Sequence, residues 1–196
     1  AWGQNDSGQM GTPILEGTTY FAPIQIGTAN TWASITAGYN HSIALRTNGT
    51  LWGWGWNGLG QLGTITPAAQ DFPIQIGTDS TWTTIAAGYY YTIALKAGTL
   101  WAWGANTYGQ LGDGTETTKL IPVKIGTDST WTSITAGGYH TLALKTDGTL
   151  WSWGLNSVGQ LGNGTTVNRN TPGQINAVIN WAEVSAGYAH TIAVKA

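Results

Sequence analysis

The sequence predicts an all-β protein, a β-propeller built from four repeats of about fifty residues that each form a four-stranded blade. Three observations support this fold class. A tryptophan-led segment recurs at spacings of 50, 49 and 50 residues, starting at Trp32, Trp82, Trp131 and Trp181. Short runs alternate as strands do, and none has helical periodicity. Glycine and tryptophan motifs return at fixed offsets. A solenoid is the alternative architecture for such a repeat.

The first two strands of each repeat are predicted to form a hairpin. The first strand has the pattern W-x-x-[IV]-x-A-G, and it ends at Gly38, Gly88, Gly137 and Gly187. The second strand alternates apolar and polar side chains, as a strand buried on one face does. It is expected at residues 41–46, 91–96, 140–145 and 190–195.

A tight turn leads to a third strand that is rich in tryptophan. The turn dipeptides are Asn48-Gly49, Ala97-Gly98 and Asp147-Gly148, and such pairs favour two-residue hairpin turns. The third strand reads Thr-Leu-Trp-x-Trp-Gly and ends in Asn-x-x-Gly-Gln-[LM]-Gly, where glycines permit the positive φ angles that stop a strand. A proline-led fourth strand is expected at residues 23–26, 73–76, 122–125 and 172–175, because proline is tolerated at a strand start or edge.

The composition limits the classes of function. Nine acidic and seven basic residues give a formal net charge of −2, and the basic residues are scattered singly. No basic stripe is therefore present for nucleic acid. Apolar runs fall short of the ~20 residues of a membrane span. The chain has no cysteine, and its neutral surface, rich in threonine, glycine and tryptophan, favours an extracellular or cell-surface location.

No catalytic, metal-binding or cofactor-binding residue is predicted. His41, His140 and His190 occupy equivalent positions, but Tyr91 replaces histidine in the second repeat, a change that a metal site would tolerate poorly. We expect half-buried rings whose nitrogens bond neighbouring backbone. Residues 53–58 match G-x-G-x-x-G, but the dinucleotide fingerprint needs a helix after its strand, and here turn chemistry follows. A non-enzymatic protein is therefore expected.

Partner contacts are expected in the loops between the third and fourth strands, because these loops vary while the strands repeat. The loops are residues 12–22, 64–72, 113–121 and 163–171. The candidate partner-binding residues are Tyr20, Phe21, Trp56, Phe72 and Tyr108. Trp56 breaks the repeat, and an exposed indole there would stack on a sugar ring or on a partner subunit.

The two ends of the sequence fall on either side of the same turn of the repeat. Residues 1–3 correspond to residues 152–154, and residues 195–196 to residues 145–146. Pairing of the terminal strands would close four blades within one chain or eight blades between two chains. The alternative is that the repeats are consecutive blades of a longer protein or of a filament. The expected assembly edge comprises Trp2, His190, Ile192 and Val194.

The motifs A-G-x-x-H-[ST]-[IL]-A-[LV]-[KR] and G-T-L-W-x-W-G-x-N-x-x-G-Q-L-G resemble the regulator of chromosome condensation repeat. The resemblance covers essentially the whole chain and implies a β-propeller. Similar repeats occur in a nuclear exchange factor for a small GTPase, in bacterial secreted proteins and in a protein inhibitor of β-lactamases, so no single function is implied. The family typically closes a ring of seven. The four repeats here lack the charged loops of the exchange factor, and exchange activity is not carried over.

The leading hypothesis is a non-enzymatic module, secreted or on the cell surface, that binds a protein partner or copies of itself. Its variable loops would choose the partner, and its ends would assemble. A carbohydrate-binding lectin and a secreted inhibitor of an enzyme are the alternatives from other functional classes.

Overall fold

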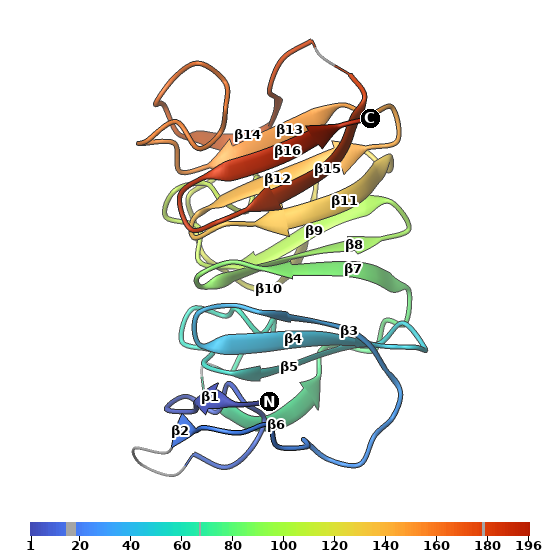
Figure 1. Ribbon diagram of the computed structural model, residues 1–196, viewed down its shortest axis with the longest axis vertical. Helices are drawn as coiled ribbons and strands as arrows, with labels where there is room; N and C mark the ends of the chain where they lie inside the picture. Colours follow the sequence, from blue (N-terminus) through green and yellow to red (C-terminus); the bar gives the residue numbers. More distant parts are fainter. Residues whose placement is uncertain (15–18, 67, 178) are drawn as a thin grey trace.

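The computed structural model describes residues 1–14, 19–66, 68–177 and 179–196 and shows a stack of antiparallel sheets (Figure 1). Three four-stranded sheets follow one another along the long axis, and a two-stranded sheet lies at each end. The described part of the chain contains strands and no helix. The all-β prediction and the four-stranded unit are confirmed.

The first two strands of each unit form the predicted hairpin. The first strands are β3 (Trp32–Ala37), β7 (Trp82–Ala87), β11 (Trp131–Ala136) and β15 (Trp181–Ala186). The second strands are β4 (His41–Arg46), β8 (Tyr91–Lys96), β12 (His140–Lys145) and β16 (Thr191–Lys195). In β4, β8 and β12 five consecutive residues are buried. Burial on one face was expected, but neighbouring sheets cover both faces.

The third and fourth strands complete each sheet. The third strands are β1 (Gly3–Gln4), β5 (Leu51–Gly55), β9 (Thr99–Gly104) and β13 (Leu150–Gly154). The fourth strands are β2 (Thr19–Tyr20), β6 (Gln70–Gln75), β10 (Lys119–Ile125) and β14 (Arg169–Gln174). Residues 15–18 and residue 67, within two of the predicted variable loops, lie outside the described residues.

The proline-led start of the fourth strand is a wrong prediction. Pro73, Pro122 and Pro172 lie inside β6, β10 and β14, where the pairing register shifts. A register shift interrupts the ladder, so proline need not supply an N–H there. In the first repeat the strand expected at residues 23–26 is absent, but two hydrogen bonds between Ala1 and Ile24 continue the pairing. The Ile24 N–H donates to the Ala1 carbonyl at 2.9 Å, and the Ala1 amino group donates to the Ile24 carbonyl at 2.7 Å.

The hydrophobic core lies between sheets. One cluster joins the second and third full sheets through Leu95, Ile134 and Trp153. A second joins the first and second through Leu45 and Trp103. Large aliphatic and aromatic side chains are thus removed from water at each joint, and this burial drives the stacking.

An indole hydrogen bond recurs at each of the three joints that precede a full sheet. The second tryptophan of each third strand donates its indole N–H, at 2.9 Å, to the main-chain carbonyl of a glutamine in the preceding repeat. The pairs are Trp54 with Gln9, Trp103 with Gln61, and Trp153 with Gln110. Each buried indole therefore satisfies its polar atom while it fills the joint.

The chain ends lie at opposite ends of the stack (Figure 1). Strand β1 pairs with β2 alone, and β15 pairs with β16 alone, so the terminal units are half-sheets. A four-bladed ring closed within one chain is therefore wrong for this structure.

A buried asparagine fixes the start of each loop between the third and fourth strands. Asn106 Oδ1 accepts the Leu111 N–H at 3.0 Å, and its amide donates to the Thr115 and Thr117 carbonyls at 2.9 and 3.2 Å. Asn5, Asn57 and Asn156 accept the corresponding N–H in their own repeats. The Asn-x-x-Gly-Gln motif thus encodes loop geometry.

Replacement of Asn106 by alanine is expected to lower the free energy of unfolding by about 3 kcal/mol, because buried backbone groups lose their partners. Urea unfolding followed by tryptophan fluorescence measures this change. Thr107→Ala, at the adjacent exposed residue, is the control and should leave the midpoint unchanged. Equal midpoints for the two variants would contradict the scaffolding role of Asn106.

Candidate interaction surfaces

One end of the strands carries a continuous cluster of aromatic rings, the tyrosine rim. Its members are Tyr39, Trp56, Tyr89, Tyr90, Tyr108, Tyr139 and Tyr188. Every ring centre lies within 5.8 Å of another, and the tightest contact is the 4.2 Å stack of Tyr39 on Tyr89. Tyr39 and Tyr188 are more than half exposed, so the cluster is open to a partner.

The hairpin turns between the first and second strands bring these tyrosines together. The Tyr39 N–H donates to the Tyr89 carbonyl at 3.3 Å, and the Tyr89 N–H donates to the Gly138 carbonyl at 3.1 Å. The Gly138 N–H continues the series to the Tyr188 carbonyl at 2.9 Å. A side chain at Gly138 would begin 2.8 Å from the Tyr188 ring, so glycine is needed for this close approach.

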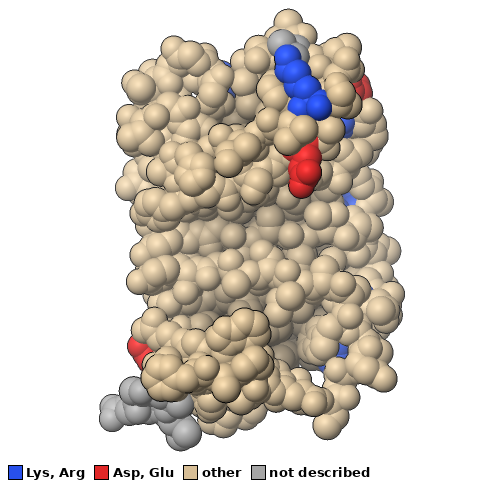
Figure 2. Space-filling model, viewed as in Figure 1, with Lys and Arg blue, Asp and Glu red and all other residues tan. Residues whose placement is uncertain are grey.

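The tyrosine rim is electrically neutral. Hydrogen bonding with Tyr39, followed by partial burial, raises the pKa of Tyr89. Burial and the neighbouring Tyr188 raise the pKa of Tyr139. The phenols of Tyr89 and Tyr139 therefore stay protonated at physiological pH. Figure 2 shows few charged side chains on the viewed face and none across its centre, in keeping with the low charge of the sequence.

The structure brings two of the five predicted partner-binding residues into the rim. Trp56 lies 5.0 Å from Tyr90, and Tyr108 lies 5.2 Å from Tyr139. Trp56 is half-buried there, which corrects the expectation of an exposed indole. Tyr20, Phe21 and Phe72 have no ring contact within the described residues, and Phe21 is 94% exposed.

Sequence reasoning missed the other five rim residues, which are Tyr39, Tyr89, Tyr90, Tyr139 and Tyr188. They occupy the two variable positions of A-G-x-x-H, and each repeat has at least one tyrosine there. That recurrence was the available signal. This signal was overlooked because the motif A-G-x-x-H was interpreted only as part of the repeated scaffold, whereas its tyrosines form the rim.

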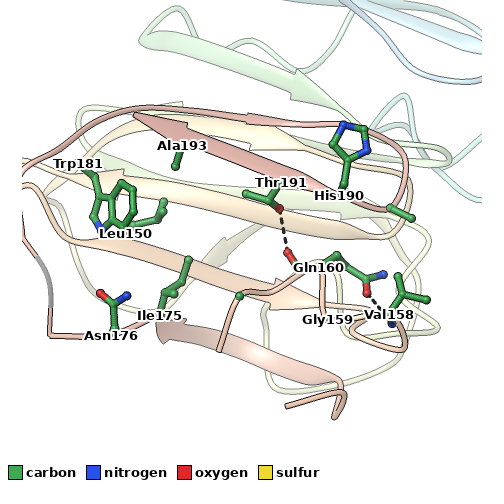
Figure 3. A pocket seen from close by; sticks show the side chains of 12 residues that line it. Leu150, Val158, Gly159, Gln160, Ile175, Asn176, Trp181, His190, Thr191 and Ala193 are labelled. Carbon is green, nitrogen blue, oxygen red and sulfur yellow. Dashed lines mark hydrogen bonds between the residues drawn. The ribbon is translucent and has the colours of Figure 1, made fainter. Parts of the chain in front are cut away.

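The half-sheet β15–β16 borders an open hollow of ≈ 450 Å³ (Figure 3). Leu150, Ile175 and Trp181 line it, and the Gln160 carbonyl accepts a hydrogen bond from the Thr191 hydroxyl at 2.8 Å. The equivalent residues of the preceding repeat surround the buried indole of Trp153. The hollow is therefore a tryptophan socket that holds no indole, and we refer to it as the indole socket.

The four predicted assembly residues are exposed where their internal equivalents are buried. Trp2 is 67% exposed, whereas Trp153 is buried. Ile192 and Val194 are 62% and 54% exposed, whereas the equivalent Leu142 and Leu144 are buried, and His190 is exposed where His140 is not. At the other end of the stack Ile35 is 68% exposed. Each terminal half-sheet thus presents an uncovered joint surface.

The family model of the RCC1-like domain matches residues 1–196 of this chain. The chain belongs to the RCC1-like domain family. This confirms the resemblance seen in the repeat motifs, and with it the propeller class of the sheets.

Known proteins similar to this RCC1-like domain include the ultraviolet-B receptor UVR8 of Arabidopsis thaliana, 35% identical over 63 residues that cover 32% of this chain and 14% of the receptor. Among solved structures, Prp20p from Saccharomyces cerevisiae matches 100% of this chain with a TM-score of 0.86 and 23% identity. Human WBSCR16 matches 98% of this chain and 66% of its own with a TM-score of 0.67 and 19% identity. The chain covers 51% of Prp20p, about half its length. These structural likenesses show the fold alone.

The histidines of the RCC1-like domain join neighbouring repeats. His41 and His140 are buried, and each ring places Nε2 3.2 Å from a threonine hydroxyl of the next repeat, Thr92 or Thr191. Half-burial and bonds to backbone were expected, but the sheets close over the rings and the partner is a side chain. Tyr91 instead donates its hydroxyl to the His140 carbonyl at 2.5 Å. Burial lowers the pKa of His41 to about 3 and that of His140 to about 4.

No group of three or more histidine, cysteine, aspartate or glutamate side chains suited to a metal ion occurs among the described residues of the RCC1-like domain. Nor does this part of the chain contain a helix long and apolar enough to cross a membrane.

Stability is expected to fall on mild acidification. The unfolded chain binds protons at histidine as the pH drops below about 6.5, while the folded RCC1-like domain keeps His41 and His140 neutral. Between about pH 7 and pH 5 the free energy of unfolding should therefore decrease by roughly 2 kcal/mol per buried histidine. Urea unfolding at the two pH values measures the loss.

The double variant His41→Tyr/His140→Tyr, which copies Tyr91, should remove most of this pH dependence. His190→Tyr, at an exposed ring, is the control that should keep it. A wild-type domain equally stable at both pH values would contradict the burial of neutral histidine.

Proposed function

We propose that this chain is a non-enzymatic protein-interaction module that assembles head to tail through its two terminal half-sheets. The indole socket beside β15–β16 carries the proposal. An indole occupies the equivalent space at the internal joints, and the chain presents an exposed tryptophan, Trp2, at its opposite end.

The repeat itself gives the contacts of the proposed joint. By equivalence with Trp153 and Gln110, Trp2 of one copy donates its indole N–H to the Gln160 carbonyl of another. By equivalence with His41 and Thr92, the His190 ring of the copy that supplies Gln160 meets the Ser42 hydroxyl of the copy that supplies Trp2.

The apolar contacts of the proposed joint follow in the same way. Val184 packs against Leu142 and Leu144 inside the chain, and by that equivalence Ile35 of one copy covers Ile192 and Val194 of another. The proposed joint thus has both polar and apolar contacts.

The proposed joint is heterologous, because different surfaces of the two copies meet. Two copies joined at both ends would form an eight-bladed ring, and further copies would form a larger ring or a filament. Pairing of β16 with a third strand would also cover an exposed sheet edge, which otherwise invites unspecific association.

Mass measurement in solution over a range of concentrations tests this assembly. We expect the wild type to form dimers or larger species, and Trp2→Ala or Ile192→Asp to be monomeric, because each removes one side of the joint. Val167→Ala, at an exposed loop residue, is the control that should assemble normally.

Mixing the two blocked variants provides a sharper test. Trp2→Ala retains a working socket, and Ile192→Asp retains a working Trp2, so the mixture should form a dimer with a single joint. A wild-type chain that is monomeric at every concentration, or a mixture that stays monomeric, would overturn the proposal.

The tyrosine rim supports a second role, recognition of a protein partner. Tyrosine supplies large contact area with a polar tip at low conformational cost, and it is enriched at the energetic centres of interfaces. The rim is neutral, contiguous and partly exposed. We propose that it acts in an extracellular or cell-surface setting, as the composition favours, and an enzyme inhibited by the module is one class of partner.

Loss of rim rings should weaken partner capture. We expect the double variant Tyr39→Ala/Tyr188→Ala to bind a protein partner roughly tenfold more weakly or worse. The reason is that tyrosines that become buried in an interface act as hot spots. Ile121→Ala, on the exposed edge strand β10, is the matched control. Saturable binding on a glycan array that the same double variant abolishes would favour a lectin and overturn the protein-binding role.

A further inference from the structure

Every full sheet holds a cation against two tryptophan rings. The sets are Arg46 with Trp32 and Trp52, Lys96 with Trp82 and Trp101, and Lys145 with Trp131 and Trp151. The cation lies 3.8, 4.3 and 3.9 Å from the centre of the nearer ring in the three sheets. Cation–π attraction therefore fixes the charge at the same place in each repeat.

In the second and third sheets an aspartate neutralises this cation. Asp79 lies 2.5 Å from Lys96, and Asp128 lies 2.5 Å from Lys145. Each carboxylate is also held by the threonine two residues further on, as in the 2.6 Å bond from the Thr81 hydroxyl to Asp79. The fold thus contains a carboxylate position beside the cation.

The first sheet lacks that carboxylate. Ala29 stands at the position of Asp79 and Asp128. Within the described part of the chain Arg46 has no ion pair, and its Nε is buried without a hydrogen-bond partner. A buried donor without an acceptor is costly, so an acceptor supplied from outside would be bound favourably.

The space beside Ala29 is a cavity of ≈ 370 Å³, which Arg46, Trp52 and Phe72 also line. The equivalent cavity of the third sheet contains Asp113, Lys124, Asp128 and Lys145, two acids and two bases. The first repeat has Thr12, Gln25, Ala29 and Arg46 at these positions. The cavity of the first sheet therefore has one positive charge without an opposing charge, whereas the acids and bases that line the cavity of the third sheet are equal in number.

We propose that Arg46 and the cavity beside Ala29 form a binding site for a carboxylate, that of an acidic side chain on a protein partner. The Arg46 guanidinium carbon lies over the Trp52 ring, 3.8 Å from its centre, and arginine N–H groups match carboxylate oxygens in pairs. Trp52 and Phe72 offer apolar contact to the methylene that carries the acid. None of the residues assigned above to the terminal joints lines this cavity, which borders the hollow beside Trp2 through Ile26, Trp32 and Pro73.

Titration with acetate and with a capped single-aspartate peptide, followed by the NMR signal of the Trp52 indole N–H, tests the site. The wild type should show a saturable shift. Ala29→Asp supplies the missing carboxylate internally and should weaken binding roughly tenfold or more. Asp79→Ala should create a second site of the same kind, detected at the Trp101 indole N–H.

Ala29→Asn is the matched control, because it fills similar space without charge and should keep most of the binding. Equal loss in Ala29→Asp and Ala29→Asn would show that the cavity is merely blocked and would overturn the proposal. A shift of equal size with a capped asparagine peptide, or tighter binding of inorganic phosphate than of acetate, would overturn it as well. Thermal unfolding of each variant checks that the fold is kept. Mass measurement in solution determines separately whether the variant still assembles.

Discussion

The hydrogen bond from a third-strand indole to a glutamine carbonyl of the preceding repeat is the contact on which the stack depends. It sets how closely two sheets approach, and it gives the largest side chain of the joint both a polar partner and an apolar pocket. Because the donor and the acceptor belong to successive repeats, no unit is complete alone. A half-sheet therefore presents either an exposed indole, as at Trp2, or a socket that holds no indole, as beside Gln160.

The strands were predictable because the sequence encodes them locally. Alternation defines β8 and β12, and turn dipeptides such as Asp147-Gly148 place the hairpins within one or two residues. Ring closure was not predictable, since the angle between sheets results from the sum of all side-chain contacts at a joint. The tyrosine rim was hidden for a similar reason, because Tyr89 and Tyr139 become neighbours only when sheets stack.

Repetition provides an internal standard for judging individual residues. Asp79 and Asp128 show what the position beside the cation does when it is acidic, so Ala29 stands out as a change of chemistry at an otherwise repeated site. Trp56 stands out in the same way, as the one tryptophan at a position with Gln4, Ala105 and Leu155 elsewhere. The change at Ala29 indicates a carboxylate site, and the change at Trp56 adds an aromatic ring to the tyrosine rim.

The tyrosine rim reaches the proposed joints only through Tyr39 and Tyr188, so assembly and partner binding can operate together. The proposed joints use sheet faces and the edge of β16, whereas the rim lies at the strand ends. There, backbone hydrogen bonds link Tyr39, Tyr89, Gly138 and Tyr188 in series. By the same repeat, the Tyr188 N–H of one copy would donate to the Tyr39 carbonyl of the next. Assembly would then extend the aromatic surface without interruption and multiply the sites offered to a repetitive or multivalent partner, which raises avidity without any new contact.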